Sequence, residues 1–198
     1  MVRSLACEAL LKAGVRRLPV RIKSVAEQFG ISVFTYTQYA DTVDCSVAEV
    51  AQRYGADGFT QCIGGRVAVF YYQSGNLRRI RWTIAHELAH VLLGHLQDGG
   101  GADADRQADA LAAELLCPSA VVAACGCTGP RELVQLCDIS PAAAACRWRE
   151  LAAPYTEPLP TEVALLRQME SFLREGNREE QVSEVFLPPL PRLKSHRI

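Results

Sequence analysis

Apolar positions in the first third of the chain predict two short helices followed by a strand. Residues 3–14 and 20–29 each place apolar side chains three or four positions apart, which is typical of helices with one buried face. Gly30 is expected to end the second helix. Residues 31–37 alternate and are rich in β-branched and aromatic side chains, which predicts a strand. Residues 41–55 follow with a weaker helical pattern.

The middle of the chain combines a predicted hairpin with an apolar helix. Residues 59–63 and 66–72 are strand-like segments on either side of Gly64-Gly65, a dipeptide that favours a tight hairpin turn. A helix rich in alanine and leucine follows and is expected to end near Gly94. This order predicts a small sheet edge just before the helix, where an extended peptide can bind as an added strand.

Helices dominate the remainder of the chain. Residues 103–118 have a helical pattern that ends at a proline, and residues 131–151 predict a helix, a short turn and a second helix. A proline-rich linker over 154–160 precedes a helix over 161–175, and residues 187–198 are expected to be extended or disordered. These elements predict an α+β fold, with a small sheet packed against the central helix and helical C-terminal segments.

Length, composition and charge narrow the class of protein. The chain has 198 residues, of which 49% are hydrophobic, enough for one domain with an appendage or two small domains. Its net charge of −1 argues against a general polybasic surface for nucleic acid or membrane. No apolar stretch approaches the ~20 residues of a transmembrane helix, and the start does not resemble a secretory signal. We therefore expect a cytoplasmic protein that does not act at a membrane.

The eight cysteines are expected to be reduced, because nothing in the sequence indicates secretion. Cys125-Gly126-Cys127 is the only tight pair. Its spacing of one intervening residue differs from the two to four that are typical of zinc ligands. Structural or incidental cysteines are therefore favoured over a second metal site.

The central helix carries His86-Glu87-Leu88-Ala89-His90, an H-E-x-x-H pattern. Residues four apart lie on one face of a helix, so both imidazoles can bind a single cation. Glu87 lies beside them, where it can hold and deprotonate a metal-bound water. This combination is typical of zinc-dependent peptidases.

Three residues compete to be the third metal ligand, namely His95, Asp105 and Glu114. His95 lies five residues after His90, at a helix end, where a residue that caps the helix or supports a ligand is favoured. On the helix over 103–118, Asp105 shares a stripe with Asp109 that continues into apolar residues. Glu114 is expected on the other, outward side. The helix faces therefore favour Asp105.

The aspartate stripe has two interpretations. Like charges four residues apart cost ~0.2–0.5 kcal/mol in an isolated helix, and a bound cation would turn that cost into a gain. In the gluzincin arrangement, a carboxylate ligand is followed four residues later by an aspartate that hydrogen-bonds a ligating histidine, and Asp105 and Asp109 suit these two roles. Alternatively, both aspartates simply stabilise the positive N-terminal end of the helix. The H-E-x-x-H motif favours the first interpretation.

Three segments resemble the ImmA/IrrE family of metallopeptidases. Residues 81–95 are similar to the family's R-F-T-L-A-H-E-L-G-H-x-L-L-x-H run, and residues 105–118 to its E-x-x-A-N-x-F-A-A-E-L-L-M-P run. Leu18-Pro19-Val20 and residues 30–33 resemble a common opening of these proteins. The family's usual glutamate ligand falls at Asp105, a shorter side chain. Glu114 falls at a position not expected to bind metal.

The resemblance implies a zincin-like metallopeptidase. Zn²⁺ would be held by His86, His90 and Asp105, with Asp109 hydrogen-bonded to a ligating histidine. Glu87 would take a proton from the metal-bound water and pass it to the leaving amine. Tyr71, Tyr72 and Tyr155 are candidates for stabilising the oxyanion.

The resemblance also implies a substrate. Such proteins often cut a helix-turn-helix repressor in a phage, mobile element or stress-response switch, so we expect a narrow endopeptidase that acts as an anti-repressor. The alternative is a non-proteolytic regulator or binding partner that retains a degenerate metal site, which Asp105 would favour if it fails to complete the site.

Three regions are expected along the chain. Residues 1–128 would form the metallopeptidase domain, residues 129–153 a helix-turn-helix-like extension, and residues 154–198 a linker, helix and flexible tail. The extension has two interpretations, namely DNA binding through Arg147 and Arg149, or a helix pair packed against the peptidase. Its second helix is rich in alanine and has few side chains suited to reading bases, so we favour packing and expect no direct binding of nucleic acid.

Overall fold

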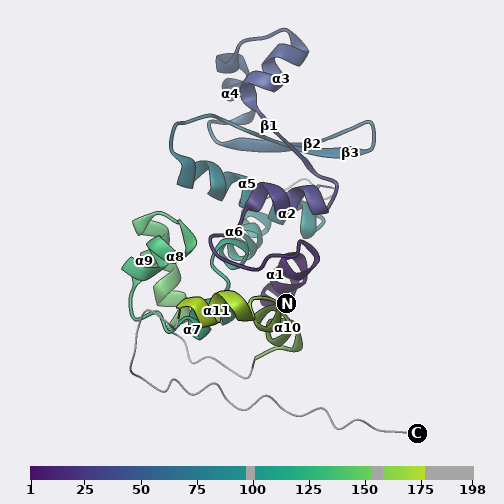
Figure 1. The fold of residues 1–198 in the computed structure, drawn as a ribbon. Helices are drawn as coiled ribbons and strands as arrows, with labels where there is room; N and C mark the ends of the chain where they lie inside the picture. The colour runs from purple at the N-terminus through teal and green to yellow at the C-terminus, as the bar shows by residue number, and fades with distance from the viewer. Residues whose placement is uncertain (97–100, 153–157, 177–198) are drawn as a thin grey trace, which may run out of the picture.

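The computed structural model describes residues 1–96, 101–152 and 158–176, which form a small mixed sheet with helices on both faces (Figure 1). The architecture is α+β, as the sequence predicts. Most of the linker predicted over 154–160 and all of the tail predicted over 187–198 lie outside the described residues.

The sheet has three strands, β1 (Ser32–Thr35), β2 (Gly58–Ile63) and β3 (Arg66–Tyr71). β3 is central, with β1 parallel on one side and β2 antiparallel on the other. Ile63 pairs with Arg66 across the turn, and both intervening glycines have positive φ. Glycine adopts this backbone conformation without steric cost, so the predicted Gly-Gly hairpin is confirmed.

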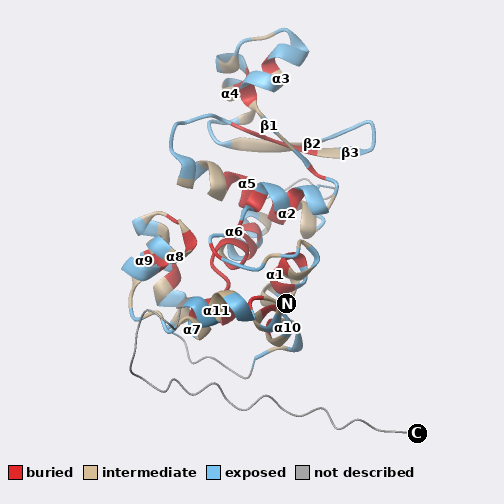
Figure 2. Ribbon diagram, viewed as in Figure 1, coloured by how far each residue is buried: buried red, intermediate tan, exposed pale blue. Residues whose placement is uncertain are grey.

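One face of the sheet lies against the two helices that form the centre of the molecule, α5 (Leu77–Leu92) and α6 (Ala102–Leu116). α5 contacts β2 and β3 directly, and α6 packs along α5. Leucines and alanines of both helices are fully buried where they meet (Figure 2). α2 (Ile22–Gln28) covers α5 from another side. The core thus holds α5 and α6 in a fixed relation.

The other face of the sheet carries α3 (Tyr36–Val43) and α4 (Val47–Tyr54), where one helix over 41–55 was predicted. Thr35 and Gln38 form a capping box that starts α3 earlier and shortens the predicted strand. Asp44, at φ 52, ends α3 in the left-handed region. A second capping box then starts α4. Local capping therefore divides the weak helical pattern into two helices.

A further group of helices lies on the side of α6 away from the sheet. Its members are α1 (Val2–Lys12), α7 (Ser119–Ala124), α10 (Pro160–Gln168) and α11 (Glu170–Gly176). α1 packs between α6 and α10, and Arg3 donates two hydrogen bonds of 2.7 and 2.8 Å to the Glu162 carboxylate. The helix predicted over 161–175 is two successive helices, separated at the buried Met169.

The helix-turn-helix-like segment consists of α8 (Pro130–Cys137) and α9 (Pro141–Leu151). Ser140 caps α9 through a hydrogen bond from the Ala143 amide. Leu133, Cys137 and Ala144 are buried in the main core. The pair is therefore packed onto the rest of the fold.

The eight cysteines are all free, as expected. Burial raises the pKa of Cys125 to about 11 and that of Cys127 to about 12. Among the described residues, the one group of three or more potential metal ligands that converge includes neither cysteine. The structure thus favours the structural role over a second metal site in this pair.

One stretch, Ala102–Ala124, has the length and composition of a membrane span, contrary to the expectation from the sequence. It comprises α6 and α7, and 67% of its apolar window is buried inside the fold. A central core helix has the same property, which agrees with the packing of α6 against α1 and α5.

Candidate metal centre

Helix α5 presents His86 and His90 on one face because they are one helical turn apart. Asn76 starts this helix by accepting a hydrogen bond from the Arg79 amide. The two imidazole Nε2 atoms lie 3.0 Å apart. Their side chains are 22% and 14% exposed, so both are accessible from one side only.

Helix α6 brings Asp105 to the same point. Its Oδ1 lies 3.4 Å from Nε2 of His90. Among the described residues, His86, His90 and Asp105 are the one group whose ligand atoms converge, all within 4.8 Å of one another. Two ligands of a tetrahedral zinc ion, each about 2.0–2.1 Å from the metal, lie about 3.3 Å apart. The three side chains therefore fit a zinc ion, and two imidazoles with one carboxylate are a donor set of catalytic zinc sites.

The other nitrogen of each histidine has its own partner. Nδ1 of His86 lies 2.8 Å from Oδ1 of Asp109, and Nδ1 of His90 lies 3.1 Å from Nδ1 of His95. These contacts orient both rings with Nε2 toward Asp105. His95 thus lies behind a candidate ligand, as the sequence suggested. Burial, followed by the charges of His86 and His95, lowers the pKa of His90, which favours the neutral ring that a metal requires.

Glu87 lies beside this cluster and contacts the sheet. The Thr60 hydroxyl on β2 donates a hydrogen bond of 2.7 Å to Oε2 of Glu87. Burial raises the pKa of Glu87, and the hydrogen bond from Thr60 partly opposes that effect. The carboxylate is therefore a stronger base than in water, with one oxygen held by the strand.

The hydrogen bond from Thr60 to Glu87 was not predicted from the sequence. The pairing of the hairpin strands nevertheless indicates that Thr60 lies on the face of the sheet that meets α5. Thr60 pairs with Val69, whose side chain is buried in the core that also contains α5. Paired residues of antiparallel strands share a face of the sheet. Gly58 lies two residues earlier on that face, and a Cβ there would be 2.5 Å from Cγ2 of Thr83. The absence of a side chain at Gly58 allows β2 to approach α5 closely.

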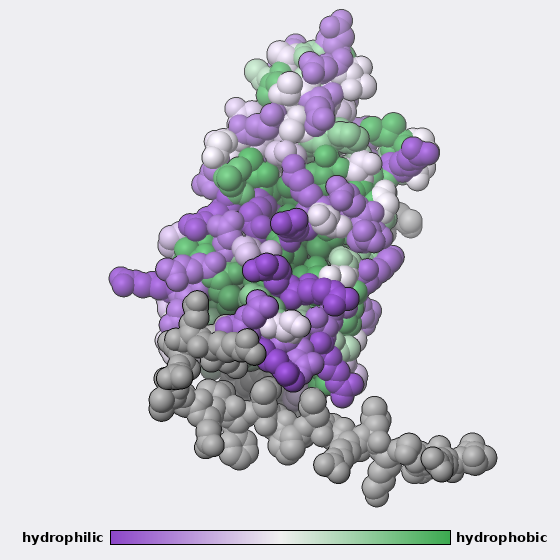
Figure 3. Space-filling model, viewed as in Figure 1, coloured by the Kyte–Doolittle hydropathy of each residue, from purple (hydrophilic) through white to green (hydrophobic). Residues whose placement is uncertain are grey.

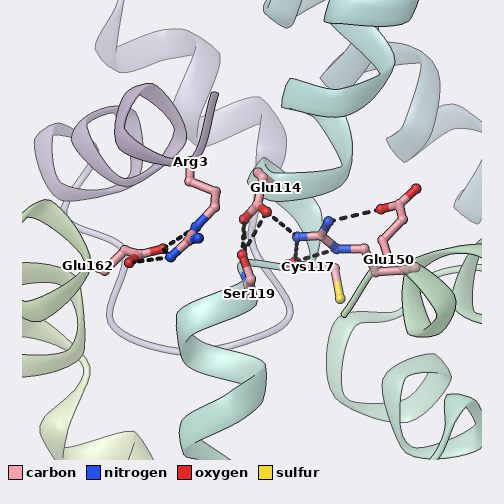
Figure 4. Close-up of polar contacts among 7 residues, drawn as sticks. Arg3, Glu114, Cys117, Ser119, Glu150 and Glu162 are labelled. Atoms are coloured by element: carbon pink, nitrogen blue, oxygen red, sulfur yellow. Dashed lines mark hydrogen bonds and ion pairs between the residues drawn. The ribbon is translucent and has the colours of Figure 1, made fainter. Parts of the chain in front are cut away.

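Glu114 is buried, so its predicted outward position is wrong. Its carboxylate accepts hydrogen bonds from the Ser119 amide and hydroxyl (Figure 4). It also pairs with Arg147 at 2.5 Å, and Arg147 donates to the Cys117 carbonyl. Glu114 therefore joins α6, α7 and α9 rather than belonging to the metal cluster. The assignment failed because helix periodicity does not reveal a partner from α9.

The tyrosines proposed to stabilise an oxyanion have other contacts. The Tyr71 hydroxyl accepts a hydrogen bond of 2.8 Å from Lys23 on α2. Tyr72 packs edge-on against Tyr36, and Tyr155 lies outside the described residues. Neither Tyr71 nor Tyr72 is hydrogen-bonded to the histidines or to Glu87, so the oxyanion donor stays unassigned.

Two histidines lie on one helix, a carboxylate lies on the next, and a half-buried glutamate lies between the sheet and these three side chains. This arrangement is typical of a zincin-like metallopeptidase. Residues 26–136 match the peptidase M78 family, described as the IrrE N-terminal-like domain. The match covers more than half of the chain, which therefore belongs to this family of metallopeptidases. The resemblance to ImmA/IrrE proteins that the sequence motifs indicate is thus confirmed. Searches of curated proteins and of solved structures each returned no match.

Proposed function

We propose that the chain is a zinc-dependent endopeptidase of narrow specificity. The observation that carries the proposal is the convergence of His86, His90 and Asp105 within 4.8 Å, directly beside Glu87. Membership of a metallopeptidase family implies a metal, and the donor set suits zinc. Asp109 completes the proposed site by orienting His86.

The residues of this chain would divide the chemistry among them. Zinc held by His86, His90 and Asp105 would supply Lewis-acid activation of a water molecule. Glu87 accepts the proton of the attacking water and delivers it to the leaving amine. Because Thr60 holds Oε2 of Glu87, Oε1 is the oxygen free to carry that proton.

The sheet supports an extended substrate. Among the described strands, β2 pairs only with β3, so the other side of β2 has unpaired backbone groups next to Glu87. A peptide added there as a strand would place its backbone near the proposed base. An exposed linker can become extended in this way, whereas a packed helix cannot.

We propose a helix-turn-helix repressor as the substrate, cut in an exposed linker within a phage, mobile-element or stress-response switch in the cytoplasm. The support is the resemblance to ImmA/IrrE proteins, together with the balanced charge of the chain, which offers no general surface for nucleic acid.

The deciding experiment is co-incubation with the repressor encoded beside the gene for this chain. Wild type should cleave it at one site, and Glu87→Gln should keep the fold and the zinc but lose cleavage, because Glu87 carries protons and is not a ligand. Casein should be cut poorly. Equal cleavage by Glu87→Gln would overturn the peptidase proposal and leave a non-proteolytic regulator. Broad digestion of casein would retain the enzyme and overturn the narrow specificity.

A further inference from the structure

An open groove of about 990 Å³ begins at His86 and Glu87 and extends along α6 to α9. We call it the α6–α9 groove. Apolar surface is exposed on this face of the molecule beside α8 and α9 (Figure 3). Its volume lies at the upper end of the range of about 300–1,000 Å³ for small-molecule pockets. Because the proposed base lines one end, whatever fills the groove lies next to the reacting bond.

The walls of the α6–α9 groove are two helices with small side chains at helical spacing. Ala110 and Ala113 line it from α6, and Ala143 of α9 and Ser140, the N-cap of α9, line it from the other side. Trp82 of α5 adds apolar surface between them. A third helix can pack between two helices when small residues allow close approach, with its own apolar side chains directed inward.

The charged residues that line the groove already have partners. Arg147 is 8% exposed and pairs with Glu114 at 2.5 Å and with Glu150 at 3.0 Å. Arg79 donates hydrogen bonds of 2.5 and 2.8 Å to Asp57. At Arg147, a phosphate or an acidic peptide would have to displace a buried pair, at the cost of unpairing a buried charge, and at Arg79 it would compete with an exposed pair. The groove therefore suits an apolar helix face better than nucleic acid.

We propose that the α6–α9 groove binds an amphipathic helix of the substrate, immediately beside the segment that is cut. The proposal rests on the peptidase function and adds a docking surface to it. The helix itself resists cleavage, because its backbone is internally hydrogen-bonded, and it delivers the adjoining extended chain to Glu87. Specificity would then depend on a helix and a linker together, which is why we expect an unstructured protein such as casein to be a poor substrate.

Substitutions that fill the groove test this proposal. Ala110 on α6 is exposed and Ala143 on α9 is half-buried, so Ala110→Trp and Ala143→Trp each add bulk in the groove. Ala145 is exposed on α9 and does not line the groove, so Ala145→Trp is the matched control. Each variant is assayed on the intact repressor and on a short peptide that spans its cleavage site without the flanking helix.

Both groove variants should lower kcat/KM for the intact repressor at least about 10-fold, mainly through KM, as expected when an anchoring contact is lost. Both should cut the short peptide like wild type and retain zinc, and Ala145→Trp should resemble wild type on both substrates. Normal cleavage of the repressor by both groove variants would overturn the docking site alone. Equal losses on both substrates would also overturn it, since they would indicate damage to the catalytic site. Failure of wild type to cleave the repressor would overturn the proposed function and the docking site with it.

A binding measurement tests the same surface without catalysis. Cys146 is exposed and lines the groove, so in a Cys62→Ser background, which removes the other exposed cysteine, it reports occupancy through its rate of reaction with a maleimide. In Glu87→Gln protein saturated with intact repressor, this rate should fall at least about 10-fold if the substrate helix covers the groove. An unchanged rate in a complex that forms would overturn the docking site.

Discussion

Thr60 Oγ1 lies 2.7 Å from Oε2 of Glu87, which joins an edge strand of the sheet to the helix that holds both histidines. The contact fixes one carboxylate oxygen, and the other is the one that we propose carries the proton. Thr60 thus orients the proposed base through its side-chain hydroxyl. The sheet therefore contributes to the chemistry as well as to the support of α5.

Thr60→Val removes the hydroxyl but keeps the size and branching of the side chain. We expect kcat to fall by roughly 10- to 100-fold, because a hydrogen bond to a charged group contributes about 1.5–3 kcal/mol. Zinc content and KM should change little. Thr60→Ser should recover most of the lost kcat. Wild-type kcat in Thr60→Val would show that Glu87 needs no support from the strand.

The central part of the site could be predicted because it depends on local geometry. His86 and His90 share a face of one helix, and Asp105 and Asp109 share a face of another, so spacing alone places each pair. The register of the hairpin was also readable, because Gly64-Gly65 defines its turn. The spacing of residues along one helix does not predict contacts between elements that are far apart in the chain.

Asp105 and Glu114 should differ in their effect on zinc. Wild type should bind about one equivalent, as expected for a single His-His-carboxylate site. Asp105→Ala should lose most of the affinity, because Asp105 reaches His90 and Glu114 does not. Glu114→Gln, which preserves shape and much of the hydrogen bonding, should keep the metal. Zinc content measured after dialysis against a chelator distinguishes them. Retention by Asp105→Ala with loss by Glu114→Gln would reverse the assignment.

Asp109 should influence zinc through His86. Its carboxylate accepts a hydrogen bond from the ring nitrogen that faces away from the metal position. Asp109→Asn weakens that contact, so zinc affinity should fall by about 10- to 100-fold while the stoichiometry at saturation stays the same. A competition titration with a chromogenic chelator measures the change. Unaltered affinity would assign Asp109 to helix stabilisation, the other interpretation of the aspartate stripe.

Glu114→Ala should destabilise the fold strongly, because it leaves Arg147 buried without its main countercharge. The expected loss is about 3–5 kcal/mol in the free energy of unfolding. Glu150→Ala is the control, since Glu150 pairs with the same arginine but is 51% exposed, and its loss should cost at most about 1 kcal/mol. Urea denaturation measures both. Similar costs for the two variants would contradict the structural role of Glu114.

The predictions that failed have two physical causes, contact between distant elements in one case and local capping in the other. Glu114 was assigned to the outward face of its helix from periodicity alone, yet Arg147 of α9 and Ser119 of α7 cover that face. A glutamate in an alanine-rich helix gives the same local pattern whether it faces water or a buried arginine. The break at Asp44 has the local cause, because capping residues on either side of it outweigh a weak apolar pattern.

The substitution Gly58→Ala tests whether the close approach of β2 to α5 is needed for stability and for kcat. A Cβ at this position would lie 2.5 Å from Cγ2 of Thr83 and 2.8 Å from the Phe70 carbonyl oxygen, closer than packed atoms allow. Gly58→Ala must therefore push β2 away from α5, at a cost of about 1–3 kcal/mol in stability. The same movement withdraws Thr60 from Glu87, so kcat should fall at temperatures where the variant is still folded.

Gly129→Ala is the matched control for Gly58→Ala, because a Cβ there meets nothing within 4 Å and the backbone at φ −170° is open to any residue. It precedes α8 as the N-cap, where alanine in place of glycine should cost less than about 1 kcal/mol. Thermal unfolding and repressor cleavage are compared for both variants. If Gly58→Ala matches Gly129→Ala in both measurements, β2 can move without consequence, and the strand would have no part in positioning the base. If only Gly58→Ala loses stability and kcat together, while its zinc content stays at one equivalent, the spacing between β2 and α5 is what keeps Thr60 on Glu87.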